Sequence, residues 1–165
     1  MKVNECIANR RSIRKFKNAP VNKEQAETLV KAAMAAPSGR NTKLREYIVV
    51  QDRALLDKLA KEMPYSKMLY TASLAIIVCG AYPEPLSDSY FTQDCAAATE
   101  NILLQAVELG LGTCWCGVYP RRERVEIIQR ILNTDKMPLN LIAVGVPDEN
   151  PAPRSVYDPA KVTWY

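Results

Sequence analysis

The run from Ser73 to Ala81 (S-L-A-I-I-V-C-G-A) is the feature that most limits what this chain can fold into. Small and apolar side chains fill it, without the alternation that a half-exposed strand shows. The apolar stretch is also only about half as long as the ~20 residues that a membrane-spanning helix needs. A strand that is apolar on both faces belongs inside a covered sheet, so the run predicts a central, buried strand.

Further strands and several helices are predicted around this run. The other strands are expected at Glu46–Gln51, Thr113–Val118 and Leu139–Val146. Helices are expected at Val3–Asn9, from an Asn22 cap to a break at Pro37, at Arg53–Glu62, at about Thr92–Leu109 and from Pro120 onward. Interleaved helices and strands indicate a layered α/β or α+β architecture. The length of 165 residues predicts a single domain over 1–165.

The C-terminal part of the chain, residues 147–165, differs in character. Four prolines punctuate it and exclude a regular helix: Pro147, Pro151, Pro153 and Pro159. The chain then ends in V-T-W-Y, and terminal aromatic side chains need a surface to pack on. We expect this tail to pack on a neighbouring subunit, with the chain's own core as the alternative.

The absence of histidine excludes whole classes of catalyst. Ser-His-Asp and Cys-His nucleophilic catalysis in their usual form both need an imidazole. The same absence argues against a metal site. The five cysteines, an odd number with no signal peptide before them, predict free thiols and a cytoplasmic protein. The net charge of +4 is too small an excess to indicate a nucleic-acid partner.

A basic run, R-R-S-I-R-K-F, spans residues 10–16. Arginine offers a planar fork of donors suited to phosphate, and Ser12 adds a hydroxyl. Arg10, Arg11, Ser12 and Arg14 could therefore hold a phosphomonoester. A solvated basic face is the alternative, and a nucleic-acid patch is disfavoured because no stacking aromatic residues are interleaved with the cations.

A second motif follows the helix that begins near Asn22. Residues 37–41 read P-S-G-R-N, where glycine permits close backbone approach to a flat ligand and Asn41 offers both a donor and an acceptor. An ordinary loop at the end of a helix has the same composition.

A third motif, G-L-G-T-C-W-C-G, spans residues 110–117 and brackets a tryptophan-bearing strand with glycines. Such a strand could lie along a ring system, or could be a core strand that follows a helix cap. Its Cys-x-Cys pair lacks the further ligands that a metal site needs. Neither a G-x-G-x-x-G fingerprint nor a Walker A sequence occurs, so a Rossmann dehydrogenase and a P-loop enzyme are not supported.

Taken in order, these motifs resemble the FMN-dependent nitroreductase family over nearly the whole chain. The matching segments are R-R-S-x-R-x-F at 10–16, A-P-S-G-R-N at 36–41, L-G-L-G-T-C-W-C-G at 109–117 and P-R-S-V-Y-D-P at 153–159. The resemblance implies an α+β, three-layer fold with a central mixed, mainly antiparallel sheet flanked by helices. It also implies an intertwined homodimer with one FMN at each of two interface sites, in which the tail packs on the partner subunit.

The resemblance implies a role for individual residues at each FMN site. The phosphate would be held by Arg10, Ser12 and Arg154, with Arg11 beside them. Two cations, Arg14 and Lys67, would lie near the pyrimidine edge of the flavin.

The ring itself would be contacted from both subunits. The partner subunit would contribute Pro37, Ser38, Gly39 and Asn41. The same subunit would line the ring with Trp115, Cys116, Gly117 and Val118.

The implied activity is reduction of nitroaromatics, quinones or related small acceptors by NAD(P)H, through ping-pong hydride transfer. A flavin suits a chain without histidine, because it carries the redox chemistry while the protein binds and orients it. Alternatives are a flavoenzyme of the same fold with another reaction (reductive dehalogenation or flavin destruction), a non-catalytic flavin-binding protein, and a DNA-associated basic protein. No membrane partner is expected.

The sequence departs from the family pattern at two places. Relatives often carry a second cation two residues after the tail arginine, where this chain has Val156. They often continue from the loop asparagine to Gln-Pro-Trp, where this chain has T-K-L-R-E at residues 42–46. These changes bear on phosphate binding and on the choice of substrate.

Overall fold

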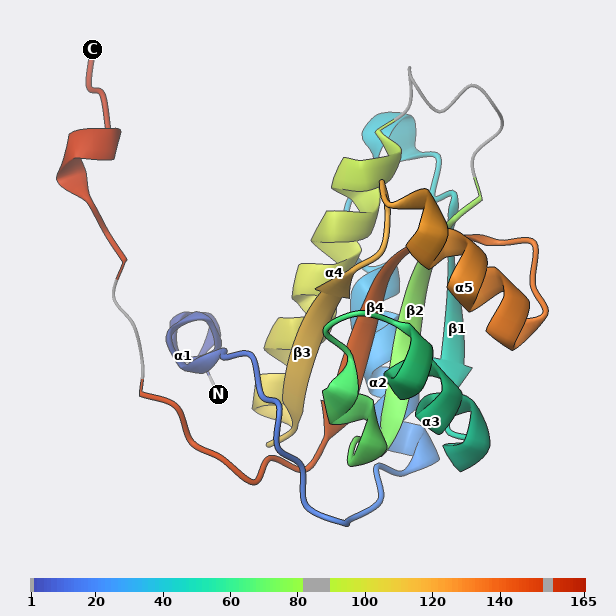
Figure 1. The fold of residues 1–165 in the computed structure, drawn as a ribbon. Coiled ribbons are helices and arrows are strands. Elements are labelled where there is room, and N and C mark those ends of the chain that lie inside the picture. The colour runs from blue at the N-terminus through green and yellow to red at the C-terminus, as the bar shows by residue number, and fades with distance from the viewer. Residues whose placement is uncertain (1, 82–89, 153–155) are drawn as a thin grey trace.

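A four-stranded sheet lies between two layers of helices in the computed structural model, which describes residues 2–81, 90–152 and 156–165 (Figure 1). The strands are β1 (Arg45–Val50), β2 (Leu74–Gly80), β3 (Gly112–Gly117) and β4 (Met137–Gly145). The α-helices are α1 (Val3–Asn9), α2 (Lys23–Met34), α3 (Arg53–Glu62), α4 (Phe91–Glu108) and α5 (Arg122–Leu132). Short 3₁₀ turns occupy η1 (Gly39–Asn41), η2 (Lys67–Tyr70) and η4 (Pro159–Lys161). The α+β, three-layer prediction is confirmed.

The strand order is β1-β2-β4-β3, and each neighbouring pair runs antiparallel. All seven residues of β2 are buried, which confirms the central strand predicted from its uniform apolar character. Strand β3 forms one edge of this sheet. A single parallel bridge joins Ser12 to Thr113 on that edge, outside the named strands.

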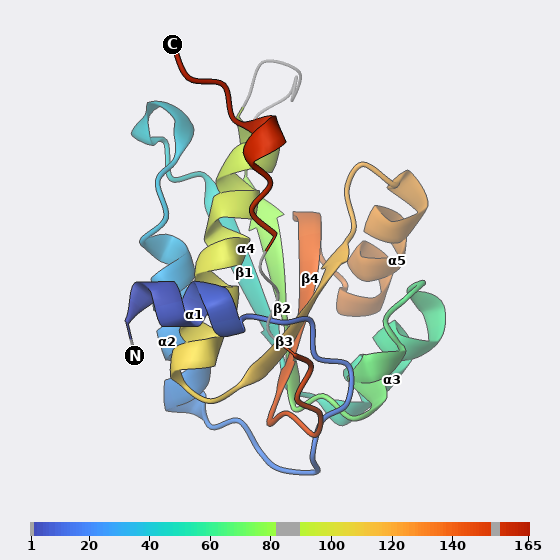
Figure 2. The same cartoon turned by 90° about the vertical axis from the view of Figure 1, so that its left-hand side faces the viewer.

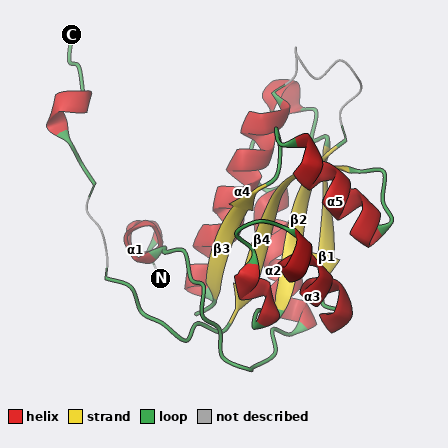
Figure 3. Cartoon of the chain, viewed as in Figure 1, coloured by secondary structure: helices red, strands yellow, loops and turns green. Residues whose placement is uncertain are grey.

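Two apolar cores cover the two faces of the sheet. Each lies between the strands and one of the helix layers that Figure 3 shows in red. The first packs α2 and α4 against one face, with Leu29, Ile76 and Ile142 fully buried. The second packs α3 and α5 against the other, around Leu59, Ile77 and Leu141. Successive strand residues point to opposite faces, so β2 contributes to both cores and must be apolar throughout.

The predicted helix signals act as expected at two places. Asn22 accepts from the Gln25 N–H, and the Gln25 side chain accepts from the Asn22 N–H, which closes the capping box. Gly110 follows α4 with a φ of +69°, a conformation that glycine adopts without strain. The expectation that Pro120 starts a helix was wrong, because α5 begins at Arg122 after a turn in which the Arg121 N–H bonds to the Val118 carbonyl.

The two ends of the described chain lie beyond the β3 edge, on one side of the molecule (Figures 1 and 2). Residues 156–165 extend away from the layers, and Val156, Tyr157 and Trp164 are largely exposed. Packing of this tail on a partner subunit stays a prediction. Residues 82–89 contain two prolines, from which we expect a loop, and they lie outside the described residues. No described helix is long and apolar enough to cross a bilayer.

Residues 10–17, here called the edge segment, lie in extended conformation along β3. The Ile13 N–H donates to the Thr113 carbonyl at 2.8 Å, and the Lys17 N–H donates to the Val146 carbonyl at 2.9 Å. Ile13 and Phe16 are buried in the core. A Cβ built on Gly112 would lie 2.9 Å from the Ile13 side chain, so only glycine lets the segment approach the strand this closely.

We therefore expect Gly112→Ala to lower the free energy of unfolding by about 1–3 kcal/mol, because the new methyl group overlaps a packed side chain. Gly117→Ala is the matched control on the same strand, since a Cβ there meets nothing within 4 Å. Urea denaturation of both variants, with hydrogen exchange at the Ile13 amide, measures the difference. Equal stability of the two variants would contradict the close packing of the edge segment.

Candidate functional site

The first of two hollows along the edge segment contains the predicted phosphate ligands. Its volume is about 420 Å³. It is lined by Arg10, Ser12, Glu100, Leu103, Thr113, Trp115 and Gly117. The arginine, the serine hydroxyl and the glycine at the end of β3 thus share one cavity with the predicted ring residue Trp115.

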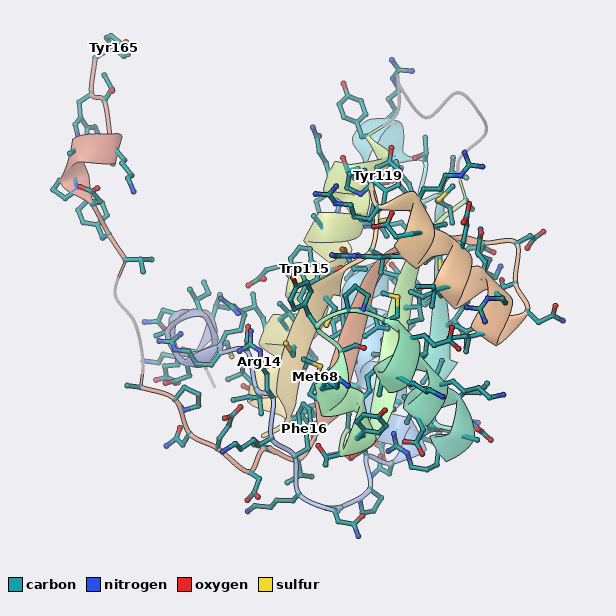
Figure 4. The ribbon with its side chains drawn as sticks, viewed as in Figure 1. Arg14, Phe16, Met68, Trp115, Tyr119 and Tyr165 are labelled. Carbon is teal, nitrogen blue, oxygen red and sulfur yellow. The ribbon has the colours of Figure 1, made fainter. Side chains whose placement is uncertain are left out.

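The second hollow contains the cations predicted near the flavin pyrimidine. Its volume is about 600 Å³. It is lined by Arg14, Lys15, Phe16, Tyr65, Lys67, Met68, Thr71 and Asp148. Figure 4 shows Arg14, Phe16 and Met68 close together below Trp115. Three cations face one carboxylate here, so the cavity has an excess of positive charge.

The edge segment accounts for the spacing of the two hollows. In an extended chain successive side chains alternate in direction. Ile13 points into the core, and Ser12 and Arg14 on either side of it remain exposed. Ser12 therefore reaches the first hollow and Arg14 reaches the second, with Cα atoms about 7 Å apart.

Arg10 forms an ion pair across the first hollow. Its Nε lies 3.3 Å from the Glu100 carboxylate on α4, with side chains 34% and 45% exposed. Partial burial raises the pKa of Glu100, and the Arg10 charge offsets this in part. The predicted phosphate ligand thus already has an anionic partner.

Arg11 points toward the C-terminal part of the chain instead. Its Nε donates to the Ala152 carbonyl at 2.9 Å, and its Nη1 donates to the Arg10 carbonyl. Its Nη2 is buried and has no hydrogen-bond partner among the described residues. A buried guanidinium nitrogen without an acceptor is costly, and this atom can donate to an anionic group without losing an existing bond.

A chain of hydrogen bonds anchors the Trp115 indole to β4 and α4. The indole Nε1 donates to the Asn140 side-chain oxygen at 2.7 Å. The Asn140 amide nitrogen donates to Thr99 at 2.9 Å, and the Thr99 hydroxyl donates to the Cys95 carbonyl at 2.8 Å. Asn140 and Thr99 are buried, so this network fixes the indole against β4 and α4.

Gly117 lines the first hollow with Trp115, but the other two predicted ring residues lie on the opposite face of the sheet. The side chains of Cys116 and Val118 are buried in the core between α3, α5 and the sheet, and neither lines the two hollows. A hydrogen bond from Cys116 lowers the pKa of the Cys114 thiol to about 7, and the same bond, with burial, raises the pKa of Cys116. All five cysteines are free and buried.

The loop of Pro37, Ser38, Gly39 and Asn41 is not brought to these hollows within one chain. It packs at the N-terminal end of α4, where the Gly39 N–H donates to the Asp94 carboxylate at 2.8 Å. The Arg45 guanidinium donates to the carbonyls of Ala36, Pro37 and Asp94. Contact of this loop with a flavin on the partner subunit stays a prediction.

Arg154 lies outside the described residues, so its convergence with Arg10 stays a prediction as well. Sequence reasoning missed several residues that build the two hollows: Tyr65, Met68, Glu100 and Asn140. Glu100 and Asn140 lie in an amphipathic helix and an apolar strand, and no local motif marks either one. Tyr65 precedes η2 with a φ of +61°, and the Arg124 guanidinium lies 5.9 Å from its ring centroid.

Comparison with known proteins gives this arrangement a family. The Nitroreductase family model matches residues 7–64 and 60–146. A protein of Methanothermobacter thermautotrophicus with a provisional NADH dehydrogenase/NAD(P)H nitroreductase name is 40% identical over 164 residues, covering 98% of this chain and 86% of the relative. The chain belongs to the nitroreductase family.

Solved structures agree with this assignment. A protein of Parabacteroides distasonis with the same provisional name matches this nitroreductase chain with a TM-score of 0.92 and 40% identity, over 98% of this chain and 96% of that one. A provisional nitroreductase from Desulfovibrio desulfuricans, solved in complex with FMN, matches with a TM-score of 0.81 and 28% identity, over 98% and 94% of the two chains. The nitroreductase fold predicted from the motifs is confirmed.

We expect Asn140→Ala to release the Trp115 indole and to lower the free energy of unfolding by about 1–3 kcal/mol, because buried polar groups lose their partners. The tryptophan emission should move to longer wavelength as the indole gains mobility and water. A Trp164→Phe background leaves Trp115 as the only emitting tryptophan, since the sequence has two. Asn101→Ala is the control. It also removes an asparagine side chain that makes a tertiary hydrogen bond, the one that the Asn101 amide donates to the Ala32 carbonyl on the neighbouring helix. An unchanged emission maximum in Asn140→Ala would show that the network does not hold the indole.

Proposed function

We propose that this chain is an FMN-dependent oxidoreductase that uses NAD(P)H to reduce nitroaromatics, quinones or related small acceptors. The proposal extends the family assignment to a cofactor and a reaction. A relative from Vibrio harveyi, named an NADPH-flavin oxidoreductase, is 27% identical over 89% of this chain, and its name supports the same class of activity.

The observation that carries the proposal is a pair of hollows along the edge segment, each of which contains cationic side chains. One offers Arg10 and Ser12, and the other offers Arg14 and Lys67. A phosphorylated flavin has the matching distribution of charge, with a phosphate at one end and a polar, electron-poor ring at the other. The edge segment contributes to both groups of donors, with Ser12 in the first hollow and Arg14 in the second.

The residues present fit such a cofactor. Arg10 and Ser12 supply charge-assisted and neutral donors for a phosphate. Arg11, the next residue along the chain after Arg10, has a buried Nη2 that lacks an acceptor among the described residues. Arg14 and Lys67 in the second hollow suit the pyrimidine edge of a ring that gains negative charge on reduction, since fixed cations stabilise a developing anion.

Bound FMN would supply the two-electron redox chemistry that no side chain of this histidine-free chain can provide. The chain's own residues would bind and orient it. Arg10 and Ser12 fix the phosphate end, and the anchored Trp115 indole forms the wall beside it. The apolar side chains of Phe16 and Met68 offer a non-polar surface in the second hollow.

The same site also supports two other functions. A flavoenzyme of this fold with another reaction, such as reductive dehalogenation or flavin destruction, would use the same cations. A flavin carrier would bind the cofactor without turnover. Both share the binding chemistry, so product analysis and turnover distinguish them from the proposed activity.

The first test is turnover of the purified full chain. We expect a yellow protein that oxidises NADPH or NADH in the presence of a nitroaromatic or a quinone and reduces that acceptor by two-electron steps. Heat-inactivated protein with the same amount of free FMN is the control for reaction in solution. Retained FMN without acceptor-dependent NAD(P)H oxidation would favour the carrier, and a protein that takes up no FMN would contradict the proposal.

The proposal includes a homodimer, because the exposed aromatic tail and the Pro37–Asn41 loop cannot complete a site within one chain. We expect light scattering at micromolar concentration to give twice the chain mass of 18.5 kDa. Removal of residues 156–165 should shift this equilibrium toward the monomer, because the apolar side chains of the tail would lose a partner surface. A full-length chain that remains monomeric would rule out a shared site.

A further inference from the structure

Glu100 is the residue in the first hollow that a phosphate-binding role does not explain. Its carboxylate faces the same guanidinium, Arg10, that is proposed to bind the cofactor phosphate, at 3.3 Å. Both side chains line one cavity with Ser12. A carboxylate and a phosphate are both acceptors for a guanidinium fork, and they repel each other.

Helix α4 fixes the backbone of Glu100 beside the hollow. Glu100 lies in the middle of the 18-residue helix, between the buried Thr99 and the pocket-lining Leu103. Its side chain is 45% exposed, so the charge is partly desolvated and is not fully screened by water. An anion that enters the hollow must therefore either displace Glu100 from Arg10 or bind beside an uncompensated like charge.

We infer that Glu100 is a specificity-determining residue of the proposed flavin site, which lowers the affinity for phosphorylated flavin by competing with the phosphate for Arg10. The inference rests on the proposed function. Its effect is confined to the phosphate, because riboflavin has the same ring and ribityl chain but no anion to repel. Glu100 thus makes FMN exchangeable while it leaves recognition of the ring unchanged.

A purely structural role for the ion pair predicts a different result. The pair also ties the start of the edge segment to α4. A separate contact, in which the Cys6 thiol lies 3.8 Å from the Glu108 carboxylate, joins α1 to the same helix. If Glu100 served only to orient Arg10, its removal would weaken FMN binding. The sign of the change in FMN affinity therefore decides between competition and support.

The test is the dissociation constant of FMN and of riboflavin, measured by flavin fluorescence titration on the full chain freed of flavin. We expect Glu100→Gln to tighten FMN binding about threefold to fivefold, the scale of a partly exposed ion pair. Riboflavin binding should not change. Glu108→Gln is the matched control, because it removes the same charge from the same helix about 12 Å away, outside the hollow.

Two further variants keep the outcomes separate. Glu100→Ala removes the carboxylate without leaving an amide and should also tighten FMN binding. It provides the same measurement if Glu100→Gln folds poorly. Arg10→Ala should weaken FMN binding about tenfold or more, as expected for a lost charge-assisted bond, and should leave riboflavin binding nearly unchanged.

The outcomes distinguish the inference from the proposed function. If Arg10→Ala leaves the ratio of FMN to riboflavin affinity unchanged, Arg10 does not bind the phosphate and the proposed site fails. If Arg10→Ala lowers that ratio but both Glu100 variants leave it unchanged or lower it, the site stands and the competition is refuted. Tighter FMN binding in both Glu100 variants, with unchanged riboflavin binding, supports the inference.

Discussion

The attachment of the edge segment to β3 is the contact on which the candidate site depends. Its main-chain bonds at Ile13 and Lys17 hold an extended basic chain beside the outermost strand of the sheet. The buried Ile13 and Phe16 then fix which side chains face outward. The main-chain bonds and the two buried anchors together determine which side chains face outward, and Ser12 and Arg14, two residues apart, line separate hollows. Glycine at position 112 makes this possible, since any side chain there would meet Ile13.

Local patterns were sufficient to predict most of the fold. The uniform apolar character of β2 gave its central position, and the Asn22–Gln25 capping box gave the start of α2. The capping box joins residues that are close in sequence, and burial of β2 on both faces shows directly in its apolar composition. The start of α5 was missed because a proline can begin a helix or end a turn, and the Arg121 N–H here completes a turn instead.

The site was predictable only where a motif concentrates its donors. The basic run identified Arg10, Ser12 and Arg14 because they stand within one extended segment. Glu100 and Asn140 gave no such signal, because their partners are distant in sequence. Glu100 pairs with Arg10, 90 residues away, and Asn140 bonds to Trp115, 25 residues away. Their positions follow from the packing of α4 against the sheet, and this packing is not visible in any local window.

After Asn41 the sequence departs from the family pattern, and a tertiary contact explains how the loop before this point is held. Where relatives often have Gln-Pro-Trp, this chain has residues that carry Arg45 into the first position of β1. From there one planar guanidinium donates to three carbonyls, two from the residues that follow α2 and one from α4. Lysine could not match this, because its single ammonium lacks the flat fork that reaches several acceptors in fixed geometry. A loop of altered sequence is thus held in place by one side chain, so the motif P-S-G-R-N keeps a defined position although its usual neighbours are absent.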